Sequence, residues 1–196
     1  FYCGLFFVFF SSIIPTTFQF TKAISLNVYI PAYYGFAFTA GSVLMSLITM
    51  KLSTVIKDYS LKPLMIVAGL LHLTIYIIMV CVIPEWSTVR PNDEPSLLIQ
   101  PRVDFVLLLA FLFGLADVAN NSSRIYISSL LLPATKQQTF GASKFYHALA
   151  ACLLLFVSPL LSIYAYAAVL TAFLAASTLV FFMTCNFIRA REERAS

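Results

Sequence analysis

The stretch from Phe145 to Ile188, FYHALAACLLLFVSPLLSIYAYAAVLTAFLAASTLVFFMTCNFI, contains no Asp, Glu, Lys or Arg. As one continuous helix it would be about 66 Å long, roughly twice the 30 Å hydrocarbon core of a bilayer. The segment therefore has to fold back on itself. Pro159, within the stretch 158–164, marks the place where a turn fits best. Two membrane-spanning helices follow, and we predict them at 141–161 and 165–188.

The whole chain has the composition of a protein whose solvent is lipid. Its 196 residues are 61% hydrophobic and 10% charged, with a mean hydropathy of +0.92. Soluble domains carry about 25% charged residues, so a soluble fold of this length would lack the polar side chains that cover a surface. Charge-poor runs of about 20 residues indicate the remaining spans, which we place at 1–21, 28–50, 63–83 and 104–131. We predict an all-α polytopic membrane protein: a bundle of six transmembrane helices over 1–188, and a short cytoplasmic tail at 189–196.

The basic residues predict how this bundle is oriented. The net charge of +4 is too small and too dispersed for nucleic-acid binding. With six spans both termini lie on one side, and nine of the twelve Lys and Arg residues fall there: Lys51, Lys57, Lys62, Arg124, Lys136, Lys144, Arg189, Arg191 and Arg194. The other side holds Lys22, Arg90 and Arg102. Because cytoplasmic loops are enriched in Lys and Arg, we predict cytoplasmic termini, in the plasma membrane or an endomembrane.

Searches for reactive motifs are negative. The cysteines Cys3, Cys81, Cys152 and Cys185 lie in apolar stretches without paired spacing, so we interpret them as small hydrophobic residues and expect no metal site. The chain has no phosphate-binding glycine loop, nucleophile elbow or zinc signature. Asp117 lacks a second intramembrane Asp that would complete a protease carboxylate pair. We therefore expect no cofactor and no enzymatic activity.

A polar constellation interrupts the fourth predicted span, in the sequence FGLADVANNSSR at 113–124. An ionisable residue inside a membrane helix is costly and is a functional hypothesis by default. Asn121 and Arg124 follow Asp117 by four and seven residues and share its helix face, with Asn120 flanking them. One interpretation is an ion or proton pathway, or a conformational switch. The other is a polar seam that holds helices together, with Arg124 snorkelling to the interface.

A secondary candidate site comprises His72, Tyr146 and His147. We place His147 about one turn from the cytoplasmic interface, as an interfacial residue or a proton relay. His72 lies deeper and is predicted to bond a neighbouring helix, with a relay to Asp117 as the alternative.

Two broader patterns concern packing. Small residues four apart predict close helix contacts at Ala37–Gly41, Ala110–Gly114 and Ala168–Ala172–Ala176. The aromatic residues of the first two spans are interpreted as facing lipid or the interface.

Several of these motifs resemble the Unc-ninety-three-like family of ion channel regulators, within the major facilitator superfamily. The stretch Gly114–Asp117 is similar to the family's Gly-x-Gly-Asp-Ala, with Ala116 in place of a glycine. Phe145–Ala150 resembles the opening of its eleventh helix, and Phe1–Gly4 the opening of its seventh. The loop 51–62 lies where facilitators carry a cytoplasmic motif, here degenerate. The resemblance implies the carboxyl-terminal six-helix half of a facilitator-type fold.

The resemblance also implies a function. Characterised family members are non-enzymatic regulators or trafficking partners of other membrane proteins, such as potassium channels and innate immune receptors. The alternatives are a secondary transporter, which would need a partner half because facilitators bind substrate between two halves, and a truncated inactive copy. The chain starts FYCG without an initiator Met, so we expect a fragment. The expected partners are the lipid bilayer and another membrane protein or the missing amino-terminal half.

Overall fold

The computed structural model describes residues 1–21, 28–56, 59, 61–91, 96–100, 102–131 and 136–195. Its described part is all-α, without a β-strand, and six helical segments are long and apolar enough to cross a membrane. The predicted fold class is thereby confirmed. The elements are α1 (Tyr2–Val8), a π-helical turn (Phe9–Ile13), α2 (Ile14–Phe20), α4 (Ile30–Val55), α5 (Lys62–Val82), α6 (Val103–Leu131), α7 (Lys136–Val157), a 3-10 turn (Ser158–Leu160) and α8 (Ile163–Ala195).

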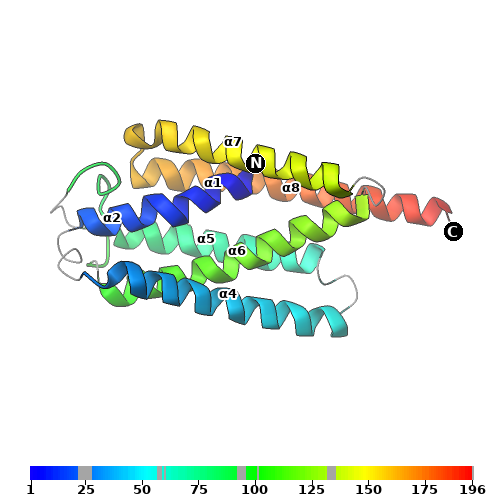
Figure 1. Cartoon of the computed structure of the whole chain (residues 1–196), viewed down its shortest axis with the longest axis horizontal. Coiled ribbons are helices and arrows are strands. Elements are labelled where there is room, and N and C mark those ends of the chain that lie inside the picture. The colour runs from blue at the N-terminus through cyan, green and yellow to red at the C-terminus, as the bar shows by residue number, and fades with distance from the viewer. Residues whose placement is uncertain are drawn as a thin grey trace.

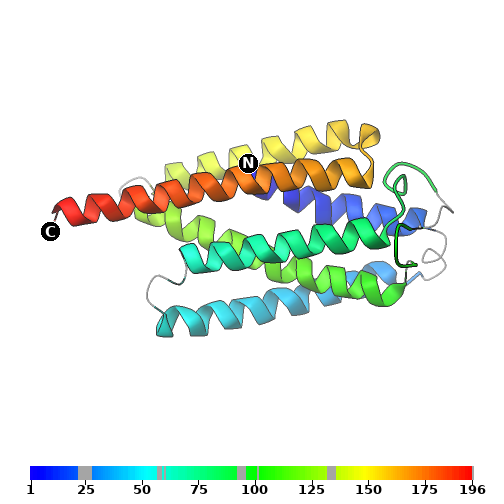
Figure 2. The same ribbon diagram turned by 180° about the vertical axis from the view of Figure 1, so that it is seen from behind.

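The helices form a bundle in which α4 and α7 lie at opposite outer edges (Figure 1). Between these edges, α1, α2 and α6 lie on one face of the bundle, and α5 and α8 lie on the other face (Figure 2). The most extensive contact joins α4 to α6, while α7 packs mainly on α1, and α8 on α5. Helix α6 touches α1, α4, α5, α7 and α8, and therefore occupies the centre of the fold.

The helix ends alternate between two ends of the bundle. The last turns of α4 and α6 and the first turns of α5 and α7 lie at the same end as the C-terminus (Figure 1). This is the end to which the sequence analysis assigns most of the basic residues. Lys22 and Lys57 fall outside the described residues, and the assignment of this end to the cytoplasm stays a prediction.

The turn predicted at Pro159, inside the charge-free stretch, is present in the structure. Helix α7 ends at Val157, the 3-10 turn contains Pro159, and α8 begins at Ile163. The Thr88 hydroxyl donates to the Leu161 carbonyl at 2.8 Å, and the Ile163 amide donates to the Glu85 carbonyl at 3.0 Å. The loop that follows α5 thus fixes this turn.

Three helices extend five or more residues beyond the spans expected from charge patterning. Helix α4 continues to Val55 rather than 50, α7 begins at Lys136 rather than 141, and α8 continues to Ala195, through the segment expected to be a tail. Lys, Gln, Arg, Glu and Ala have high helix propensity. The helices therefore continue beyond the last apolar residues. The part of α8 apolar enough to span a membrane ends at Ile188.

The first span is not a regular α-helix, which the sequence analysis did not anticipate. Pro15 has no amide hydrogen for the carbonyl four residues earlier, and its ring crowds that carbonyl. The preceding residues 9–13 form a wider π-helical turn, the usual way for a helix to absorb one extra residue. The Thr16 hydroxyl donates to the Ser12 carbonyl at 2.8 Å beside this irregularity.

The aromatic residues of the first span form the core of the bundle. Phe6, Phe9 and Phe10 are between 0% and 6% exposed, and the rings of all three lie within 6.2 Å of the fully buried Phe113 ring. The interpretation that they face lipid was wrong for these residues. Side chains inside a membrane protein and side chains facing lipid are equally apolar, so composition does not separate them.

Two glycines allow the backbones of α4 and α6 to pack closely, as the small-residue spacing predicted. A Cβ added to Gly41 would overlap the Phe111 carbonyl, and one added to Gly114 would overlap the Phe38 carbonyl. The Ser42 hydroxyl lies between the helices, 3.0 Å from the Phe38 carbonyl oxygen and 3.4 Å from that of Gly114. In lipid such close backbone contact replaces the hydrophobic effect as the force between helices.

The replacement Gly114→Ala tests this contact. We expect it to lower the free energy of unfolding in detergent by about 1–3 kcal/mol, because the new methyl group has to push α4 and α6 apart. Gly35→Ala on α4 is the matched control, since a Cβ there meets no atom within 4 Å. Thermal unfolding of both variants is the measurement, and equal effects would contradict the assigned contact.

Candidate functional site

The polar residues of α6 form a hydrogen-bonded ladder along one helix face. The Asn121 amide nitrogen donates to the Asp117 carboxylate at 2.8 Å and to the Asp117 carbonyl at 3.0 Å. The Arg124 guanidinium donates to the Asn121 amide oxygen at 2.8 Å. Spacings of four and three residues place these side chains one above the other. Asn121 therefore bridges a carboxylate and a guanidinium that lie two turns apart.

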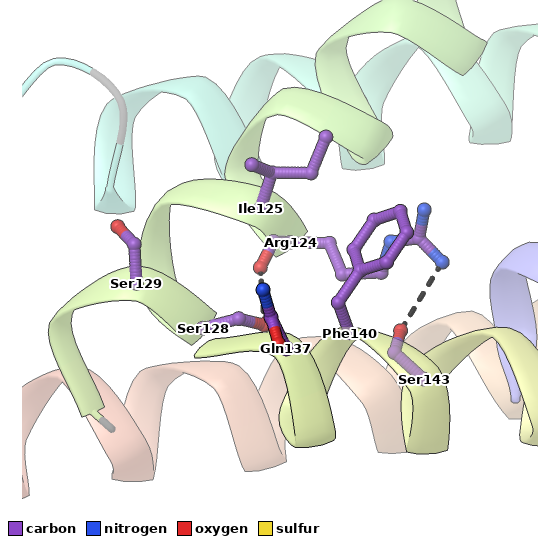
Figure 3. A pocket seen from close by; sticks show the side chains of 7 residues that line it. All are labelled: Arg124, Ile125, Ser128, Ser129, Gln137, Phe140 and Ser143. Atoms are coloured by element: carbon purple, nitrogen blue, oxygen red, sulfur yellow. Dashed lines mark hydrogen bonds between the residues drawn. The ribbon is translucent and has the colours of Figure 1, made fainter. Parts of the chain in front are cut away.

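The ladder continues onto the neighbouring helix. A second guanidinium nitrogen of Arg124 donates to the Ser143 hydroxyl of α7 at 3.3 Å. Figure 3 shows the Arg124 side chain extending from α6 toward Ser143. We call Asp117, Asn121, Arg124 and Ser143 the polar ladder. Sequence reasoning missed Ser143, although it directly precedes the Lys144–His147 cluster that was singled out.

The members of the ladder are all half-buried, and the three on α6 follow one another along the helix. Asp117 lies at the middle of the span Val103–Leu130, and its side chain is half-buried, like those of Asn121 and Arg124. Asn120 is 5% exposed and is not a member of the ladder. The structure places Asp117, Asn121 and Arg124 on one helix face, as the spacing predicted. Of the two asparagines, only Asn121 bridges the Asp117 carboxylate and the Arg124 guanidinium.

The hydrogen bonds of the polar ladder are better suited to holding helices together than to transferring a proton. Each bond has an amide or a guanidinium as its donor, and the Asn121 amide does not gain or lose a proton near neutral pH. Removing one member leaves half-buried polar groups without partners, which is costly in a low dielectric. The ladder thus ties α6 to α7 and offsets the Asp117 charge with the Arg124 charge.

His72 has a separate environment. Its side chain is fully buried, and Nδ1 lies 2.6 Å from the Ala68 carbonyl of its own helix, so Nδ1 carries the hydrogen. Among the described residues Nε2 has no hydrogen-bond partner. The rings of Phe6 and Tyr2 lie 4.2 and 5.3 Å from the imidazole, centre to centre. The predicted bond to a neighbouring helix is wrong, and His72 and Asp117 have different hydrogen-bond partners.

Among the described residues neither Tyr146 nor His147 makes a hydrogen bond to the ladder, although His147 lies one helical turn after Ser143 on α7. The Tyr146 side chain is exposed, with its ring beside Phe145, and the His147 ring lies 5.4 Å from the Phe7 ring of α1. Helix α7, which contains His147, begins at Lys136, five residues before the start expected for this span. The distance of His147 from the membrane interface stays a prediction.

Three hollows accompany these groups. One, with a volume of about 320 Å³, lies between the end of α6 and the start of α7 and is lined by Arg124 and Ser143 among others. Two larger hollows, about 680 and 470 Å³, lie between α5 and α8 and are almost entirely apolar. Asp117 lines none of the three. Within the described residues no cluster of three or more His, Cys, Asp or Glu side chains is placed to hold a metal ion.

Comparison with known proteins gives one match. The family model described as "Ion channel regulatory protein UNC-93" matches residues 1–182. No curated protein and no solved structure matches.

The replacement Asn121→Leu tests the ladder. We expect a loss of about 1–3 kcal/mol in the free energy of unfolding, because the Asp117 carboxylate and the Arg124 guanidinium both lose a buried partner. Gln138→Leu is the control, since it removes an exposed amide from α7. If the two replacements have the same small effect in thermal unfolding, the ladder does not stabilise the fold.

Proposed function

Because the chain belongs to the UNC-93 family of ion channel regulatory proteins, we propose that it binds another membrane protein inside the bilayer and regulates that partner's activity or trafficking. The family membership and six apolar helices make it an integral multi-pass membrane protein of a regulatory family. The observation that carries the proposal is the apolar groove between α5 and α8. This groove offers a surface for a partner's transmembrane helix.

The groove combines the two larger hollows. They share Leu73, Thr171 and Ala175, so they form one continuous depression along α5 and α8. The further lining residues are Met65, Ile66, Gly69, Leu70, Tyr76, Ile77, Val80, Cys81, Ala167, Ala168, Ala172, Leu174, Thr178 and Leu179. We call this surface the α5/α8 groove.

Small residues line both sides of the α5/α8 groove. A Cβ added to Gly69 of α5 meets no atom within 4 Å, and Ala168 and Ala172 of α8 are exposed. The stripe Ala168–Ala172–Ala176 was predicted to pack against another helix, yet within the chain it faces outward. In lipid, a partner helix that approaches such a surface closely gains dispersion contacts that fluid acyl chains make less well. A transmembrane helix of a regulated channel is therefore the occupant that we propose.

The alternative of secondary transport has less support. A substrate site between facilitator halves calls for polar groups that converge on a cavity at mid-membrane. Here the polar ladder pairs its groups with one another, and the large hollows are apolar. The alternative of an inactive copy predicts no effect on any channel.

We further propose that the six helices are the carboxyl-terminal half of a facilitator-type fold. Only 11% of the membrane-spanning residues of α4 and of α7 are buried, against 44% for α6. The two edge helices thus keep broad faces that a second six-helix half would cover. These faces are separate from the α5/α8 groove, which leaves the groove available to a partner.

The replacement Ala172→Phe tests the groove. Co-expressed with a panel of potassium channels, the wild-type chain is expected to change the current or surface abundance of at least one of them. Ala172→Phe should reduce co-purification with that channel at least tenfold, because the ring fills the space needed by the partner's helix. Ala40→Phe, at an exposed alanine on the edge helix α4, is the control and should retain binding.

Two results would contradict the proposal. Full retention of channel binding by Ala172→Phe would remove the α5/α8 groove from the interface. Solute uptake by reconstituted vesicles that falls with Asp117→Asn, with channel currents unchanged, would favour the transporter instead.

A further inference from the structure

We propose that the cavity between the end of α6 and the start of α7 binds the phosphate group of an anionic phospholipid. This cavity of about 320 Å³ is lined by Arg124, Ile125, Ser128, Ser129, Gln137, Phe140 and Ser143 (Figure 3), and we call it the joint cavity. The inference does not depend on the proposed channel partner. It rests on the donors, the charge and the membrane depth of these residues.

The walls of the joint cavity are mostly apolar, and its hydrogen-bond donors are few. Arg124 has five N–H donors, and its two described side-chain bonds, to Asn121 and Ser143, leave others free for a ligand. The Ser143 hydroxyl accepts from Arg124, so its own hydrogen can point elsewhere. Gln137 adds an amide from α7. The hydroxyls of Ser128 and Ser129, in contrast, donate to carbonyls of their own helix.

The charge around the joint cavity is positive. None of its seven lining residues is a carboxylate. Among the described residues Arg124 has no carboxylate within ion-pair distance, because Asp117 reaches it only through Asn121. The Lys144 ammonium lies 5.5 Å from the centre of the Phe140 ring, which lines the cavity. Gln137 lies in the first turn of α7, the positive end of the helix dipole, which adds to the same potential.

The remaining walls and the depth favour a lipid over free phosphate. The side chains of Ile125 and Phe140 are exposed and apolar, and suit the glycerol and acyl part of a lipid. The stretches apolar enough to cross a membrane end at Leu130 in α6 and begin at Gln137 in α7, and we therefore place the mouth of the cavity near the headgroup level. A guanidinium binds phosphate through paired hydrogen bonds. Basic pockets between helices on the cytoplasmic side, where our orientation places this end, are a recognised form of headgroup site.

The test measures lipid retention by the whole purified chain. The chain is reconstituted in phosphatidylcholine vesicles with or without 10% phosphatidic acid, extracted in mild detergent, and the bound lipid is counted by native mass spectrometry. We expect wild-type protein to retain phosphatidic acid preferentially. Arg124→Gln should reduce this retention at least fivefold. Arg102→Gln, which removes an exposed arginine at the other end of α6, should leave it unchanged.

A second variant separates binding from folding. Arg124→Gln also breaks the polar ladder, so Gln137→Leu is added, which alters the joint cavity and keeps every described bond of the ladder. It should reduce phosphatidic acid retention at least threefold while the unfolding temperature of the protein without added phosphatidic acid stays unchanged. Equal retention of phosphatidic acid by the wild type and both joint-cavity variants would overturn the proposal. Displacement of the lipid by millimolar inorganic phosphate would also overturn it, because the cavity would then be a site for free phosphate.

Discussion

Lipid offers no hydrogen-bond partners, and this constraint governs where most polar groups of the bundle lie. Many serine and threonine side chains inside the spans return their hydrogens to carbonyls of the preceding turn, as Thr39, Ser46, Ser123 and Thr184 do. The costlier groups, a carboxylate and a guanidinium, are paired through Asn121 and anchored to α7. Because α6 touches five other helical segments, its polar face links the most deeply placed charge to the outermost helix. The same helix carries Gly114, so a close backbone contact and the polar ladder share one element.

Patterns that depend on local spacing could be predicted from the sequence. The six spans follow from charge-free length, the turn at Pro159 from the limit on helix length, and close packing at Gly41 and at Gly114 from small-residue spacing. The shared face of Asp117, Asn121 and Arg124 follows from helical periodicity. Features that depend on three-dimensional neighbours could not be predicted. Ser143 joins the ladder only because α7 begins at Lys136 and crosses α6 there, and the core position of Phe6 depends on which face of the first span meets α6.

The errors have physical causes of the same kind. Helix α7 begins five residues before the predicted span because hydropathy marks where apolar residues end, whereas helix propensity extends the helix to Lys136. Pro15 disturbs the first span through its backbone, which hydropathy does not register.

The functional proposals assign three separate surfaces of the bundle. The α5/α8 groove is proposed for a partner's helix, the free faces of α4 and α7 for a second half, and the joint cavity for a lipid phosphate, with the polar ladder holding α6 and α7 around that cavity.

The central claim is that Asp117 and Arg124 act as one unit although an amide separates them. A double-mutant cycle tests it most directly: the free energy of unfolding is measured for the wild type, Asp117→Asn, Arg124→Gln and the double variant. If the two charges compensate each other through Asn121, the double variant loses less than the sum of the single losses, by about 0.5–3 kcal/mol. Additive losses would show that the two residues act independently, and would contradict the account.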